Sequence, residues 1–178
     1  GVIILEFILV MPLLFIAFLA SFEFAFLGLV IQAGTTAAIE GARAGSLQYA
    51  AALAFDNNGG GDTSPLGDDD IADKIALCVE AHLAVHGLEV RDNGVSDNAN
   101  RANVRVEIER GNNTATRGDE TITCNRVGTA PAATEVVVTV CFNLVDSANP
   151  QGSGNPVPNW LNSFGIDLLT KRFQMSSR

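Results

Sequence analysis

Two histidines are the side chains of this 178-residue chain whose type and spacing come nearest to a metal site. His82 and His86 lie at i and i+4, which places both on one face of a helix. The residues between them are Leu-Ala-Val, without the glutamate of a metalloprotease helix. We therefore favour one packed and one solvent-facing histidine, and we predict no metal site.

The three cysteines are the next candidates for chemistry. Cys78, Cys124 and Cys141 fit no metal-binding spacing, and the chain has no C-x-x-C motif. In an oxidising compartment two of the three could form a disulfide. Cys124 and Cys141 both lie in strand-like segments, so this pair is favoured over any pair with Cys78. The alternative of three small buried apolar residues stays open.

Signatures of catalysis and of cofactor binding are missing from the sequence. It contains no G-x-S-x-G, P-loop or G-x-G-x-x-G motif. The glycine run 59–61 lies among Asn and Asp residues, which suits a turn better than a phosphate-binding loop. The triplet Asp68-Asp69-Asp70 lacks the EF-hand spacing and favours a helix N-terminus over a Ca²⁺ site. We expect no catalytic residue, no cofactor and no enzymatic activity.

The charge of the chain is acidic, with a formal net charge of −9. Lys and Arg are scattered and form no block, whereas nucleic-acid binding needs a basic patch. Acidity of this kind suits a solvated outer surface. We expect no nucleic-acid partner.

The element that dominates the chain is an apolar run from Phe7 to Ile31, broken only by Ser21, Glu23 and Gly28. About 20 apolar residues cross a bilayer as a helix, so the run is long enough to span a membrane. A cleavable signal peptide fits poorly, because a positive n-region is missing and the apolar part is too long. We expect a chain that has been processed to begin at residue 1, although a truncated chain would begin in the same way.

Two glutamates and a proline are unusual within this run. A carboxylate at the bilayer centre costs roughly 2.5–3.5 kcal/mol, but Glu6 and Glu23, about 25 Å apart on a helix, could lie near opposite boundaries. A second hypothesis for Glu6 is a charge pair with the N-terminal amine of a neighbouring subunit. Pro12 predicts a kink or a melted turn, which suits a helix packed among its own copies.

Small residues follow the apolar run and change the character of the helix. Gly41 and Gly45 form a G-x-x-x-G step, which lets another helix or a sheet approach closely. An Ala-rich helix without a partner is the alternative. Residues 1–54 are predicted to form one long helix, with 1–32 as the membrane or filament-core segment and 33–54 packed on a head domain. The head is assigned to residues 55–178.

Several of these residues carry a resemblance to a known family. The opening Gly-Val-Ile-Ile-Leu-Glu-Phe, followed by the apolar run with Pro12, resembles the class III signal-peptide subunits of type IV pilus systems. The closer resemblance is to TadE-like pseudopilins of tight-adherence (Tad) pili. It includes a second Glu-Phe pair at Glu23-Phe24, the run Ala-Ala-Ile-Glu-Gly-Ala-Arg-Ala at 37–44 and the C-terminal strand. The resemblance is strong over residues 1 to about 50 and weakens over the head.

This resemblance implies cleavage by a prepilin peptidase, assembly through the helix and export by a dedicated machine. In this class the glutamate usually stands fifth after cleavage, whereas here it stands sixth. Either Gly1 precedes the cut, or this chain is trimmed one residue earlier. The residues expected to serve assembly are Gly1, Glu6, Phe7, Pro12, Glu23, Gly41 and Gly45.

The head is predicted to be of the α+β class. The Gly-rich segment 57–62 ends the long helix, and an apolar period over 71–83 predicts a second helix that Gly87 closes. Strands are expected at 104–109, 121–125, 134–144 and 166–175, with a loop at 145–159 and a short helical turn from Trp160. We expect an antiparallel sheet of about four strands, packed on the long helix and on residues 70–86.

Together these patterns predict a structural subunit of an extracellular, Tad-type filament on the bacterial surface, supporting adhesion. The expected partners are copies of the chain, other pilins, the assembly machinery with its prepilin peptidase, and the cytoplasmic membrane before assembly. Two alternatives remain: a minor or tip pseudopilin that primes assembly of another pilin, and a membrane-anchored binding module. A tethered enzyme is disfavoured.

Overall fold

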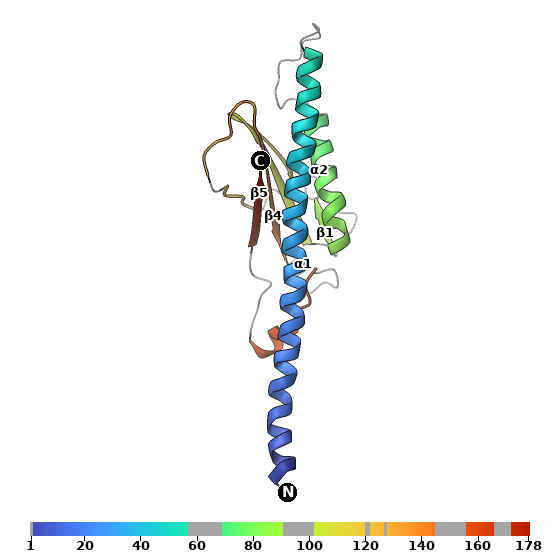
Figure 1. The fold of residues 1–178 in the computed structure, drawn as a ribbon, viewed down its shortest axis with the longest axis vertical. Helices are drawn as coiled ribbons and strands as arrows, with labels where there is room; N and C mark the ends of the chain where they lie inside the picture. The colour runs from blue at the N-terminus through green and yellow to red at the C-terminus, as the bar shows by residue number, and fades with distance from the viewer. Residues whose placement is uncertain are drawn as a thin grey trace.

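The structure is a computed structural model that describes residues 2–56, 69–90, 102–119, 122–126, 128–144, 156–165 and 172–178. Two helices, two 3₁₀ turns and five strands follow one another along these residues. Figure 1 shows the first helix as one long rod, with the second helix and the sheet beside its C-terminal half. The elements are α1 (Val2–Asp56), α2 (Asp69–Leu83), η1 (Ala84–His86), β1 (Leu88–Val90), β2 (Ala102–Arg110), β3 (Asn113–Gly118), β4 (Val136–Asn143), η2 (Leu161–Phe164) and β5 (Arg172–Ser177).

The long helix predicted from the sequence is confirmed. At 1.5 Å per residue, the 55 residues of α1 extend over about 80 Å. Pro12 lies inside α1, and the chain is helical on both sides of it. The predicted melted turn is therefore wrong. Proline removes a single hydrogen bond from the helix, and the bonds before and after that position remain.

The sheet is mixed, with the order β1-β2-β4-β5 and with β3 also paired to β2. β2 runs antiparallel to β3 and β4, and β4 runs antiparallel to β5. β1 pairs parallel to the start of β2, with Leu88 opposite Ala102. The prediction of a purely antiparallel sheet is therefore corrected. A parallel pair needs a longer connection than a hairpin, and the chain between Val90 and Ala102 is long enough to make one.

One face of the sheet forms the core with the two helices. Val104, Val106 and Ile108 of β2 are fully buried on this face, as their alternation with charged residues predicts. α2 presents Ile75 and Val79 to the same core, which also includes a stripe of alanines from α1. The predicted packing of an α+β head on the second half of the long helix is therefore observed.

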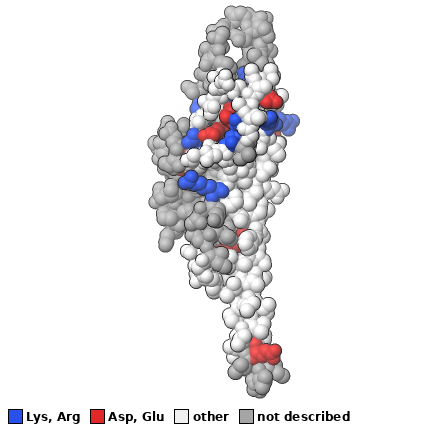
Figure 2. Space-filling view, turned by 90° about the vertical axis from the view of Figure 1, so that its left-hand side faces the viewer, with Lys and Arg blue, Asp and Glu red and all other residues white. Residues whose placement is uncertain are grey.

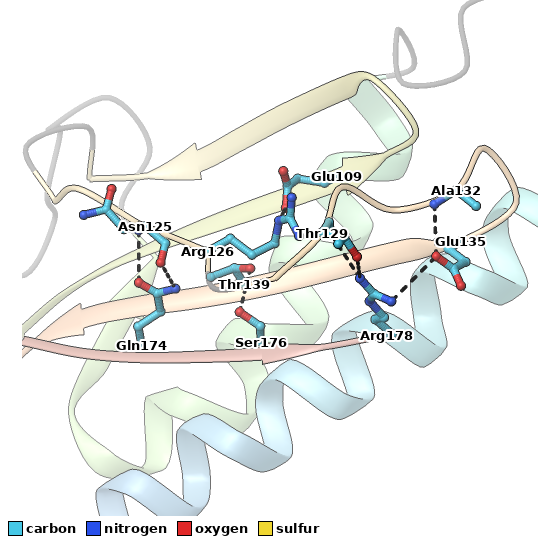
Figure 3. Close-up of polar contacts among 10 residues, drawn as sticks. All are labelled: Glu109, Asn125, Arg126, Thr129, Ala132, Glu135, Thr139, Gln174, Ser176 and Arg178. Atoms are coloured by element: carbon cyan, nitrogen blue, oxygen red, sulfur yellow. Dashed lines mark hydrogen bonds and ion pairs between the residues drawn. The ribbon is translucent and has the colours of Figure 1, made fainter.

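The opposite face of β4 is buried as well, which suits the central place of this strand in the sheet. Thr139 and Cys141, on that face, are almost inaccessible to solvent. Cys141 forms a disulfide with Cys124, the pair favoured from the sequence, and Cys78 is a free thiol. Residues 122–126 and 128–135, which we call the strap, cross the outer face of the sheet (Figure 3).

Side chains hold the strap in place. The N–H of Asn125 donates to Gln174 Oε1 at 3.0 Å, and Gln174 Nε2 donates to the carbonyl of Asn125 at 2.6 Å (Figure 3). Arg178 donates to the carbonyl of Thr129 at 3.0 Å. The strand predicted at 121–125 is therefore wrong over its described residues, because the backbone there bonds to a side chain instead of a neighbouring strand.

The remaining elements agree with the sequence to different degrees. α2 continues through η1 and ends at Gly87, whose φ of 73° is the left-handed conformation expected of a helix-closing glycine. β2, β4 and η2 lie where strands and a turn were expected. β5 begins at Arg172, and the earlier part of its predicted range lies outside the described residues, as do most of the predicted loop 145–159 and the break at 57–62.

Candidate functional site: the apolar half of α1 and its junction with the head

The N-terminal half of α1 is almost bare of partners within the described chain. In Figure 2 this part of the molecule is mostly uncharged, and charged side chains gather on the head above it. By length and composition this helix could cross a membrane, and little of its apolar stretch is buried. Eleven large apolar side chains are exposed on residues 2–22, which we call the stem, namely Ile4, Phe7, Ile8, Leu9, Val10, Met11, Leu13, Leu14, Phe15, Phe18 and Phe22.

Glu6 and Phe7 lie near the free end of this stem. Both side chains are exposed, and no described residue forms an ion pair with Glu6. Gly1 lies outside the described residues. The Glu6 carboxylate is available to a charged group from another molecule, since no residue in the described part of the head offers one.

Glu23 has a different environment, because it faces the head. Its side chain is 1% exposed, and Oε1 accepts a hydrogen bond from the backbone N–H of Leu161 at 2.7 Å. Leu161 is the first residue of η2, where backbone N–H groups have no partner within the turn. The glutamate therefore caps η2 from another element of the same chain. Its predicted place near a membrane boundary and its predicted part in assembly both stay predictions.

The glycines of the predicted assembly motif also face the head. A Cβ on Gly41 would lie 2.8 Å from Cγ2 of Val79 in α2, and one on Gly45 would lie 2.9 Å from Cγ1 of Val136 in β4. Gly34 belongs to the same face, where a Cβ would lie 2.8 Å from a ring carbon of Phe142. These residues let α1 approach its own head closely, so their expected place in assembly between subunits is corrected.

The residues considered for metal binding do not form a site. The ring Nδ1 of His82 lies 2.9 Å from the carbonyl of Cys78, one turn earlier on α2. His82 is exposed and His86 is half-buried. Across the described residues, no group of three or more metal-binding side chains comes together. Burial raises the pKa of the Cys78 thiol, and the nearby Glu40 carboxylate raises it further.

The helix α1 thus has two parts that differ in burial. From Val30 onward, one face of the helix is covered by α2 and the sheet. The stem, residues 2–22, has no such cover among the described residues. The hydrogen bond from Leu161 of η2 to Glu23, near the border between these two parts of α1, spans 138 positions in the sequence and has no local signal. Only the unusual position of a glutamate inside an apolar run pointed to this residue.

Comparison with known proteins found no relative of this chain. The chain matches no protein-family model, no curated protein and no solved structure.

Proposed function

We propose that this chain is a structural subunit of an extracellular, type IV pilus-like filament of the tight-adherence type, assembled through the N-terminal half of α1. The observation that carries the proposal is the exposed apolar surface of that half. Burying one Leu- or Phe-sized side chain contributes about 1.5–3 kcal/mol. A stem that exposes eleven large apolar side chains needs lipid or other helices around it.

The subunit has two such environments in succession. Lipid covers the stem in the cytoplasmic membrane, and the stems of neighbouring subunits cover it in the filament. Lipid tails are as apolar as leucine, so apolar burial alone does not favour the filament over the membrane. Transfer therefore needs the work of an assembly machine, after a prepilin peptidase has released the N-terminus.

Glu6 supplies an interaction that lipid does not offer. Its exposed carboxylate pairs with the N-terminal amine of a neighbouring subunit, and both charges are then buried together. A buried pair of this kind favours one register over others, because a shifted neighbour would leave a charge without its partner. The site of cleavage sets which residue carries the N-terminal amine, and therefore how closely this amine approaches the Glu6 carboxylate of the neighbouring subunit.

The heads form the outside of the filament. Their acidic charge and the polar strap over the sheet suit a solvated surface that meets other cells or materials. The resemblance to TadE-like pseudopilins favours a second candidate, a minor or tip subunit that primes assembly of another pilin. In both roles the stem packs against other stems.

Electron microscopy of the sheared extracellular fraction, with peptide sequencing of the filaments, tests the proposal. Filaments made mainly of this chain support a major subunit, and a trace amount within filaments of another protein supports the minor one. A chain that stays entirely in the membrane fraction of filament-bearing cells contradicts both. That result would favour a membrane-anchored binding module.

A further inference from the structure

The segment 156–165, which we call the foot, has an apolar inner face and an apolar outer face. Val157 and Leu161 are fully buried, and η2 within the foot contacts α1. Trp160 and Phe164 lie on the other side, 44% and 49% exposed. Trp160 is the only tryptophan of the chain. These two aromatic side chains lie next to the exposed apolar stem, and large exposed apolar patches mark sites of interaction with proteins or membranes.

The foot lies beside Glu23 of α1, which accepts a hydrogen bond from the N–H of Leu161. Figure 1 shows the foot beside α1, between the sheet and the N-terminal end of the rod. The part of α1 before Glu23, residues 2–22, has a length of about 31 Å as a helix. The hydrocarbon core of a bilayer is about 30 Å thick. A stem inserted over this length places the foot at the membrane surface nearer the head.

The side chains of the foot suit that depth. Trp and other amphipathic aromatic residues are enriched at the boundary between hydrocarbon and headgroups, where the ring is covered and its N–H can bond. The buried carboxylate of Glu23 has a hydrogen-bond donor there, so the stem can reach this boundary without an unpartnered acid. The foot contains no Lys or Arg, which points to aromatic contacts with lipid and not to attraction by anionic headgroups.

We propose that the foot is a membrane-interface anchor, with Trp160 and Phe164 seated in the headgroup boundary of the bilayer while the stem spans it. The anchor fixes the depth of the stem and holds the base of the head against the membrane. It rests on the membrane-inserted stage of the proposed function and is independent of whether filaments form. Leaving the membrane then requires these two side chains to leave the boundary together with the stem.

The single tryptophan makes the depth of the foot measurable. The full chain is reconstituted in phosphatidylcholine vesicles that carry bromine either near the headgroup end or near the tail end of the acyl chains. We expect blue-shifted emission, weak quenching by acrylamide, and stronger quenching by the shallow bromine than by the deep one. Emission typical of water, without quenching by either lipid, overturns the proposal when the chain floats with the vesicles. Stronger quenching by the deep bromine overturns it too.

Four variants distinguish a change in the membrane contact of the foot from a change in the folding of the chain. Phe164→Ser removes an exposed side chain and is expected to reduce quenching by the shallow bromine. The matched control, Val85→Ser, changes an exposed apolar residue on η1 and should leave the emission of Trp160 unchanged. Glu23→Ala removes the cap of η2 and is expected to shift the emission to the red, whereas Glu23→Gln keeps an acceptor oxygen and shifts it less. Equal quenching in all four variants contradicts the anchor.

Failure of this inference is distinct from failure of the proposed function. A chain that does not float with vesicles contradicts the membrane stage, and with it the anchor. A chain that floats without interfacial quenching contradicts the anchor alone. Interfacial quenching in a chain that never appears in filaments supports the anchor and counts against the filament subunit.

Discussion

The carboxylate of Glu23 accepts a hydrogen bond from the backbone N–H of Leu161 at 2.7 Å, 138 positions later in the chain. Among the described residues, this is the polar contact between the head and α1 that lies nearest the N-terminus. It makes an acid within an apolar run part of the internal structure of the chain. The junction between the stem and the head therefore includes a hydrogen-bond donor for the buried side chain of Glu23.

Replacing Glu23 by Ala should lower the free energy of unfolding by about 1–3 kcal/mol, because the N–H of Leu161 is left buried without an acceptor. Glu23→Gln should cost less, since its amide oxygen can still accept. Chemical denaturation of the detergent-solubilised chain measures both. Equal stability of the wild type and Glu23→Ala would show that the hydrogen bond contributes nothing.

Gly41→Ala should destabilise the chain, although alanine is the better helix former. Its new Cβ would lie 2.8 Å from a branched methyl of Val79, and overpacking of this kind costs about 1–3 kcal/mol. Gly28→Ala is the matched control, because a Cβ there meets nothing within 4 Å. That change should stabilise α1 by about 0.5–1 kcal/mol. The melting temperatures in detergent should therefore move in opposite directions, and a shift in the same direction contradicts the close packing.

Reduction of the disulfide should loosen the strap. Cys124 and Cys141 are 17 positions apart, and closing a loop of that size stabilises a fold by about 3 kcal/mol. The melting temperature should fall on adding a reductant, and Cys78→Ala should melt like the wild type under oxidising conditions. A melting temperature insensitive to reductant means that the side chains of Gln174 and Arg178, bonded to the backbone of Asn125 and Thr129, hold the strap without the disulfide.

The thiol of Cys78 should react slowly at neutral pH. Its pKa is raised by burial and then by Glu40, so the reactive thiolate forms only at a pH above the usual range for cysteine. The rate of modification by a thiol reagent should therefore rise at higher pH than in the denatured chain. Glu40→Gln should move this rise towards lower pH. Coinciding pH profiles of native and denatured chains would contradict the raised pKa.

Glu6→Ala should reduce the amount of filament without affecting the head. The stem keeps its apolar surface, so the variant should still be found in the membrane, but the proposed partner of the neighbour's amine is lost. Glu6→Asp retains the charge and should recover part of the assembly. Filament yields measured in the sheared fraction would contradict the pairing if Glu6→Ala matched the wild type.

Much of the fold follows from local sequence patterns. The apolar run and the small residues after it predict α1, and the alternation around Val104 and Val106 predicts β2. β4 was recognised from its unbroken valines. β1 has only three residues, and β3 reads Asn-Thr-Ala-Thr-Arg-Gly, without the side chains typical of strands. Both strands exist because β2 provides an edge to pair with, which is not a local property.

The sequence identified the unusual residues of the candidate site but not the residues that they contact. The G-x-x-x-G step of Gly41 and Gly45 correctly indicated a close approach, but the spacing does not say whether the approaching surface belongs to the same chain. Glu23 was recognised as unusual, and its partner Leu161 could not be found because nothing nearby in the sequence relates them. The exposed aromatic residues of the foot became meaningful only when the fold placed them beside α1.

The central claim is that stems of neighbouring subunits cover one another in the filament. A photo-reactive amino acid at Leu13, 69% exposed on the stem, tests it directly in purified filaments, with the same group at Val85, 83% exposed on the head, as the control. We predict that Leu13 cross-links to residues in the N-terminal half of α1 in another copy, or to a second pilin. Cross-links of Leu13 to lipid or to no protein at all, in filaments that contain the chain, would contradict it.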